Sequence, residues 1–119
     1  MPNPVVHFEV VGKDGAKLQQ FYANLFGWKI NADNPMKYGL VDNEGQGING
    51  GIGESPQGKS LTFYVEAEDP QAVLNKAEQL GGKTVIPVTV IPGMVTMAQF
   101  ADPEGNVVGV VASGAPPAQ

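Results

Sequence analysis

The amino-acid sequence contains one pattern twice, and this duplication constrains the fold more than any other feature. Residues 5–30 read as an alternating run, a turn, an amphipathic run and a closing glycine, and residues 61–85 repeat that order without a gap. The aligned pairs are Phe8/Phe63, Val10/Val65, Asp14/Asp69, Leu25/Leu80, Gly27/Gly82 and Ile30/Val85. The turn sequence Asp-Asn-Glu-Gly at residues 42–45 is echoed by Asp-Pro-Glu-Gly at residues 102–105. Two copies are too few for a solenoid, so the sequence predicts one domain built from a duplicated module.

Each copy is expected to form a strand, a helix and then three strands. Asp14 is the predicted N-cap and Gly27 the predicted C-cap of the first helix. Asp69 followed by Pro70 is a strong start signal for the second helix. Strands are predicted at residues 5–11, 28–30, 37–41, 46–52, 61–66, 83–90, 95–101 and 106–111. We therefore predict an α+β domain at residues 4–112, with module one at 4–54, module two at 59–112 and a flexible tail at 113–119.

The alternation in each first strand predicts which side chains lie under the helix. The apolar sets Val6, Phe8, Val10 and Leu61, Phe63, Val65 are expected to pack there. The helices are expected to bury Leu18, Phe21, Tyr22, Leu25 and Val73, Leu74, Ala77, Leu80. The opposite sheet face is then available for a ligand and carries His7, Glu9, Thr62, Tyr64 and Glu66.

Composition excludes several classes of function. The chain has 119 residues and a net charge of −5, with no arginine and no cysteine. A nucleic-acid-binding surface is therefore not expected, and neither is a disulfide, a thiol nucleophile or a thiolate metal site. No apolar run approaches the ~20 residues of a membrane span, so we expect a cytoplasmic protein without membrane association.

Three sequence motifs resemble the vicinal oxygen chelate superfamily, which includes glyoxalase I, the bleomycin-resistance proteins and the extradiol dioxygenases. They are Val-His-Phe-Glu-Val at residues 6–10, Phe-Tyr-Ala-Asn-Leu-Phe-Gly-Trp at residues 21–28 and Phe-Ala-Asp-Pro-Glu-Gly-Asn-Val-Val-Gly at residues 100–109. The resemblance implies two βαβββ modules that form a curved mixed sheet around a cavity. It also implies a homodimer, and it leaves open whether one chain or two chains form the cavity.

Enzymes of this family commonly hold a divalent metal with residues of the first and last strands. The resemblance places His7 at the first-strand position of module one and Thr62 at the matching position of module two. The last-strand positions fall on Asn49 and Gly109. Because His7 alone is a strong ligand, and a transition metal needs three or four such ligands, we expect no metal and no other cofactor.

Candidate ligand-binding residues are expected on the cavity face. His7 and Glu9 are also the candidate catalytic pair, since an imidazole beside a carboxylate could move a proton. The interpretations of Trp28 as core or as pocket wall stay open, whereas core packing is favoured for Tyr38 and Phe100. Glycines at 47 and 51 are expected to leave room for a ligand. The complete ligand-binding prediction is His7, Glu9, Trp28, Asn49, Thr62, Tyr64, Met94, Met97 and Gly109.

Three hypotheses for function follow. The first is a metal-free protein that binds a small neutral or cationic organic molecule, an antibiotic or a metabolite, as the bleomycin-resistance proteins do. The second is an enzyme that uses His7, either a metal-dependent lyase, isomerase or dioxygenase or a metal-free proton-transfer catalyst. The third is an interaction module without a small-molecule site. The acidic charge favours a neutral or cationic ligand over an anionic one, and we favour the binding protein over the enzyme.

Overall fold

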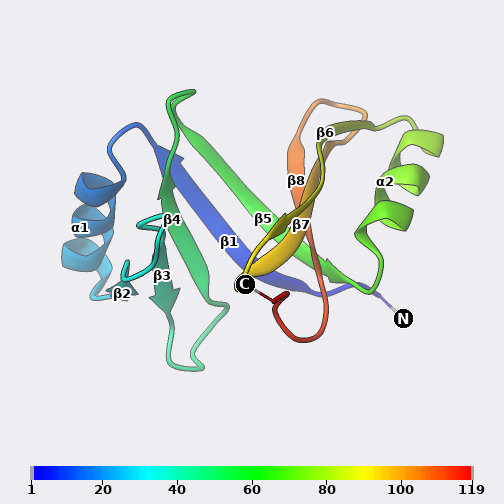
Figure 1. Cartoon of the computed structure of the whole chain (residues 1–119). Coiled ribbons are helices and arrows are strands. Elements are labelled where there is room, and N and C mark those ends of the chain that lie inside the picture. Colours follow the sequence, from blue (N-terminus) through cyan, green and yellow to red (C-terminus); the bar gives the residue numbers. More distant parts are fainter. Residues whose placement is uncertain (1, 119) are drawn as a thin grey trace. The chain divides into compact units, whose positions relative to one another are not determined.

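The computed structural model describes residues 2–118 and contains two modules with the predicted order of elements (Figure 1). Module one has strand β1 (Val5–Gly12), helix α1 (Gly15–Phe26) and strands β2 (Lys29–Asn31), β3 (Gly39–Asp42) and β4 (Gly50–Glu54). Module two has strand β5 (Ser60–Ala67), helix α2 (Pro70–Gln79) and strands β6 (Lys83–Ile91), β7 (Val95–Ala101) and β8 (Val107–Ala112). Two βαβββ modules in an α+β fold are thus confirmed. Neither helix is long and apolar enough to cross a membrane.

The two modules share one strand order. In module one the order is β2-β3-β4-β1, and in module two it is β6-β7-β8-β5. In each module the first and last strands pair in parallel, and the remaining pairs are antiparallel. A parallel pair needs a crossover connection, and each helix begins that connection.

The chain divides into two compact units, with one division between Val5 and Val6 and the other within β5. One unit is Val6–Phe63, and the other joins the residues up to Val5 with those from Tyr64 onward. Two hydrogen bonds attach the N-terminal residues to the second unit. The backbone N–H of Glu66 donates to the carbonyl of Pro4 at 2.9 Å, and the Asn3 amide donates to the carbonyl of Glu66 at 2.9 Å.

The helix caps and turns agree with the sequence analysis. Asp14 accepts a hydrogen bond from the backbone of Lys17, and Asp69 caps α2 in the same way. Gly27 ends α1 with a φ of 70°, a left-handed conformation that glycine adopts at little cost. The repeated turns also match, because Asp42 and Asp102 each accept a hydrogen bond from the backbone N–H two residues later.

The core of module two lies between α2 and its sheet. Buried Leu74 packs with Ala67, Ala98 and Val110, and Val73, Val88 and Phe100 surround this cluster. Phe100 therefore has the core role expected for it.

In module one Val41 and Ile52 are buried, and a partly exposed aromatic cluster surrounds Trp28. The Trp28 ring lies 5.2 Å from the Phe8 ring, 5.6 Å from the Tyr22 ring and 5.1 Å from the Phe26 ring, measured between centroids. Trp28 thus joins β1 to α1, and of its two possible roles the structure shows core packing.

Part of each predicted apolar face is exposed. On α1, Phe21 and Leu25 are both more than half exposed. Gln19 takes the inward place, because its amide donates to the carbonyls of Ile52 at 2.8 Å and Lys37 at 3.1 Å. These bonds turn α1 so that the stripe containing Gly15, Leu18, Gln19 and Tyr22 faces β4.

On β5 the predicted alternation holds, but the apolar residues of its first half do not pack under the helix. Leu61 is 78% exposed and Phe63 is 42% exposed, whereas Thr62 and Tyr64 are buried. Only Ala67, at the other end of β5, joins the core around Leu74.

The segment predicted as a flexible tail makes defined contacts. The backbone N–H of Ser113 donates to the carbonyl of Ala67, and that of Gly93 donates to the carbonyl of Pro117, both at 2.9 Å. Residues 113–117 are therefore held at two points of module two.

Two leucines of α2 test this description of the core. Leu74→Ala is expected to lower the free energy of unfolding by about 2–5 kcal/mol, because it removes a fully buried side chain. Leu80→Ala serves as the matched control and should change it by no more than about 0.5 kcal/mol, because Leu80 is 70% exposed. Urea titrations of both variants measure the difference. Equal losses would show that the predicted apolar stripe, and not the observed one, is buried.

Candidate functional site

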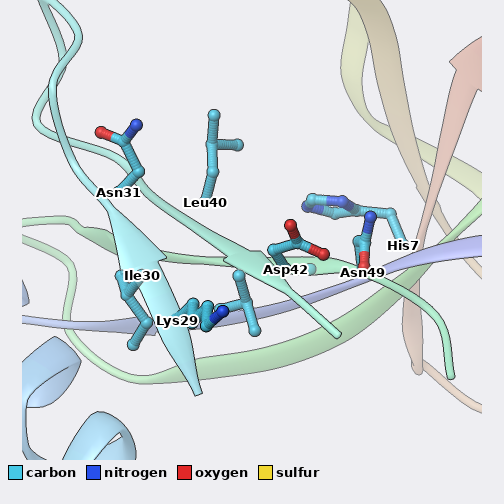
Figure 2. Close-up of a pocket in the computed structure, with 9 residues that line it drawn as sticks. His7, Lys29, Ile30, Asn31, Leu40, Asp42 and Asn49 are labelled. Carbon is cyan, nitrogen blue, oxygen red and sulfur yellow. The ribbon is translucent and has the colours of Figure 1, made fainter. Parts of the chain in front are cut away.

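Module one contains an open pocket of about 470 Å³ (Figure 2). Strands β1, β2 and β3, the start of β4 and the residue before it provide its walls. The lining residues are His7, Lys29, Ile30, Asn31, Leu40, Val41, Asp42, Asn49 and Gly50. His7, Asp42 and Asn49 lie together at one end, and Asn31 and Leu40 lie at the other (Figure 2).

The alternation of the strands places the polar wall on the sheet face opposite α1. Phe8 packs on Trp28, which in turn stacks on Tyr22 of the helix, so the neighbour of Phe8, His7, points to the other side of the sheet. In β3, Gly39 and Val41 are buried, whereas Leu40 and Asp42 are exposed. This is the face on which the sequence predicted a ligand.

His7, Tyr38 and Glu9 form a hydrogen-bonded chain at one side of the pocket. Nε2 of His7 lies 2.9 Å from the Tyr38 hydroxyl oxygen, and that hydroxyl donates to Oε2 of Glu9 at 2.8 Å. Each of the three side chains is half-buried. Tyr38 therefore connects the two residues that the sequence analysis named as a candidate catalytic pair.

The His7–Tyr38–Glu9 hydrogen bonds determine which ring nitrogen of His7 carries the proton. The Tyr38 hydroxyl has one hydrogen and donates it to Glu9, so it accepts a hydrogen from Nε2 of His7. Burial of the imidazole lowers the pKa of His7 below its ordinary value. His7 is thus neutral near pH 7, with its proton on Nε2.

The Tyr38 ring has a defined place because strand β4 is rich in glycine. A side chain at Gly51 would overlap the Tyr38 ring, and one at Gly53 would contact it at 3.0 Å. The amide of Asn34 holds the Tyr38 backbone at both its N–H, at 3.0 Å, and its carbonyl, at 2.7 Å. Gly51 therefore makes room for Tyr38, and the expectation that it leaves space for a ligand is wrong.

The residues at the opposite side of His7 form a polar turn. Oδ1 of Asp42 accepts from the backbone N–H of Glu44 at 2.8 Å, and Oδ1 of Asn49 accepts from that of Asn43 at 2.8 Å. Lys29 pairs with Glu44 at 2.9 Å across this turn. Asp42 and Asn49 thus hold the turn in shape and line the pocket as well.

Of the predicted ligand-binding residues, His7 and Asn49 line this pocket, and Glu9 reaches it through Tyr38. The predicted residues of module two are not among those that line this pocket. Tyr64 covers Gly109 and accepts a hydrogen bond from Gln99 at 2.8 Å, and the Thr62 hydroxyl lies 3.4 Å from the carbonyl of Phe63. Met94 and Met97 lie half-buried in the β6–β7 hairpin.

Sequence reasoning missed several pocket residues. Tyr38, which lies beside the pocket residue His7 and immediately before β3, was expected in the core, although it alternates with Leu40 and Asp42 of that strand. Lys29 and Asn31 share the corresponding face of β2, where they pair with Asp42 and Leu40. Applying the alternation rule to these two short strands would have identified all of them.

The side chains present do not fit a transition-metal site. Within residues 2–118, no three or more His, Cys, Asp or Glu side chains form a group that could hold a metal ion. Nε2 of His7 is already bonded to Tyr38. Asn49, which occupies the family's last-strand ligand position in module one, uses its amide oxygen within the turn.

A comparison with known protein families identifies the family of this chain. The family model described as a glyoxalase-like domain matches residues 7–111. The chain belongs to the glyoxalase-like domain family. The match covers both modules, as the duplication requires.

Curated relatives and solved structures agree with this family. The Mycobacterium tuberculosis (strain CDC 1551 / Oshkosh) protein CFP32, whose description as a glyoxylase is provisional, is 28% identical over 108 residues, or 82% of this chain. This chain spans 41% of that protein's length. The structure is similar to methylmalonyl-CoA epimerase from Mycobacterium tuberculosis, with a TM-score of 0.67 and 12% identity over 92% of this chain and 87% of that one. It is also similar to a glyoxalase/bleomycin resistance protein/dioxygenase superfamily member from Vibrio splendidus 12B01, with a TM-score of 0.62 and 17% identity over 94% and 100% of the two chains.

The space beside Gly51 gives the first test of the site. Gly51→Ala is expected to lower the free energy of unfolding by about 1–3 kcal/mol, because the new methyl group must displace the Tyr38 ring. Gly47→Ala is the matched control, since a methyl group there meets only the Asn43 side chain at 4.0 Å. Denaturant unfolding of both variants checks this. A Gly51→Ala protein as stable as the control would contradict the placement of Tyr38.

The lowered pKa of His7 gives a second test. The unfolded chain binds a proton at His7 more readily than the folded chain does, so stability falls as pH drops through the unfolded pKa of about 6.5. His7→Gln keeps an N–H donor for Tyr38 but cannot titrate. Between pH 7.5 and pH 5.5, at about one-unit steps, the wild type should lose more unfolding free energy than His7→Gln. Parallel curves would show that burial does not lower the pKa of His7.

Proposed function

We propose that this glyoxalase-like domain binds a small neutral or cationic organic molecule in the pocket beside His7. The pocket itself is the observation that carries the proposal. It combines the apolar wall of Leu40 with hydrogen-bonding groups from Asn31, Asp42 and Asn49. A few polar groups converging on a partly apolar cavity are typical of small-molecule sites.

The charges around the pocket support a neutral or cationic ligand. Asp42 lines it directly, and Glu9 lies behind Tyr38. The one cation in its lining, Lys29, is paired with Glu44. An anionic molecule would enter a region of negative potential, in a chain whose net charge is −5.

The proposal includes binding without a metal. Of the four family ligand positions, His7, Thr62, Asn49 and Gly109, only His7 carries a strong ligand, and its Nε2 already donates to Tyr38. The proposal also keeps the cytoplasmic location and the homodimer expected from the sequence and the family resemblance. An antibiotic or a metabolite would satisfy the chemistry of the pocket.

A second candidate function is metal-free proton transfer, and the His7–Tyr38–Glu9 chain is the observation that favours it. A neutral imidazole backed by a phenol and a carboxylate can accept a proton from an acidic C–H group of a bound molecule. Incorporation of solvent deuterium into a bound ligand would distinguish this enzyme from a protein that only binds.

Ligand screening with a pocket variant tests the binding function. In buffer containing a chelator, at least one compound in a panel of antibiotics and aromatic metabolites should raise the melting temperature, because it binds the folded state. Leu40→Ser should lower the affinity for that compound about tenfold, because the apolar contact with Leu40 is lost. Leu61→Ser is the control, since Leu61 is 78% exposed and does not line the pocket.

Two results would contradict the proposal. One is a ligand whose affinity is the same in wild type, Leu40→Ser and Leu61→Ser, because it would bind elsewhere. The other is a stoichiometric metal in the purified protein that is lost in His7→Ala.

A further inference from the structure

The pocket contains a carboxylate whose neighbouring cation is directed elsewhere. Asp42 on β3 and Lys29 on β2 are directly opposite one another in the antiparallel register. Opposite charges at such positions usually pair across the strands. Here Nζ of Lys29 lies 2.9 Å from Oε2 of Glu44 instead.

The turn after β3 causes this arrangement. Glu44 has a left-handed φ of 54°, and its N–H donates to Oδ1 of Asp42 at 2.8 Å. The Glu44 carboxylate is the main cause of the raised pKa of Lys29, and Asp42 contributes least among the causes. Glu44 therefore satisfies Lys29, and Asp42 keeps its second oxygen, Oδ2, for the pocket.

Two amide groups complete the polar wall. Oδ1 of Asn31 accepts from the backbone N–H of Asp33 at 2.8 Å, and Oδ1 of Asn49 accepts from that of Asn43. Within residues 2–118, neither amide nitrogen takes part in a hydrogen bond that would compete with a ligand. Figure 2 shows the Asp42 carboxylate between Leu40 and the pair formed by His7 and Asn49.

We propose that the ligand carries a protonated amine, which pairs with Asp42, and an oxygen acceptor, which takes an N–H from Asn31 or Asn49. Its apolar part lies against Leu40. This inference rests on the proposed binding function and narrows it from neutral or cationic molecules to organic amines. Because Asp42 is exposed, the charge selects for the amine and the pocket as a whole supplies the remaining affinity.

Matched pairs of compounds isolate the charge. The probes are arylalkylamines such as phenethylamine and tryptamine, each paired with its N-acetyl derivative, which keeps the ring and loses the cation. Binding is measured from NMR shifts of the module one amides. The amines should bind the wild type about three- to tenfold more tightly than their acetylated partners.

Three variants test the role of each charge. Asp42→Asn should abolish the preference for the amine, while its amide oxygen can still accept from the N–H of Glu44. Glu44→Gln should reduce the preference as well, because it releases Lys29 to pair with Asp42. Glu104→Gln is the control, since it removes the same charge from the matching turn of module two and should leave the preference unchanged.

The outcomes separate this inference from the proposed function. Equal affinity for amines and their acetylated partners, or a preference that survives in Asp42→Asn, overturns the inference and leaves a neutral-molecule site intact. Binding of neither class, together with no hit among the antibiotics and metabolites, overturns both. A preference lost equally in Glu104→Gln would show a general effect of net charge and would also overturn the role of Asp42.

Discussion

The contact between the Tyr38 ring and glycine strand β4 determines the rest of the site. Because Gly51 has no side chain, the ring can lie on the strand and bring its hydroxyl between His7 and Glu9. That one placement fixes the tautomer of the imidazole and removes Nε2 from the atoms that could hold a metal. It also makes His7 a fixed wall of the pocket, beside the polar turn that contains Asp42.

The fold could be predicted from the sequence because its signals are local and occur twice. Asp14 and Asp69 cap the helices, Gly27 ends the first helix, and the Asp42 and Asp102 turns match in their hydrogen bonds. Helix faces were less predictable. A polar Gln19 that bonds two carbonyls turned α1 away from the most apolar stripe, and no hydrophobic pattern reveals such a bond.

The site was predictable only in part. Strand alternation identified the face that carries His7 and Glu9, and Asn49 was found through the family resemblance. Tyr38 was missed because core packing was favoured for its ring. Its partners come from β1, so only the three-dimensional pairing of β1 with β4 reveals the link. The separation of Lys29 from Asp42 depends in the same way on one turn conformation.

We infer that His7 serves a pocket for an organic molecule and does not anchor a metal. A crystal structure of protein purified without added metal, with anomalous data collected above the zinc edge, tests it most directly. We expect no anomalous peak at the imidazole, an intact hydrogen bond from His7 to Tyr38 and organic density along Leu40 and Asp42. A metal ion bound to His7, with Tyr38 displaced from it, would contradict this role of His7.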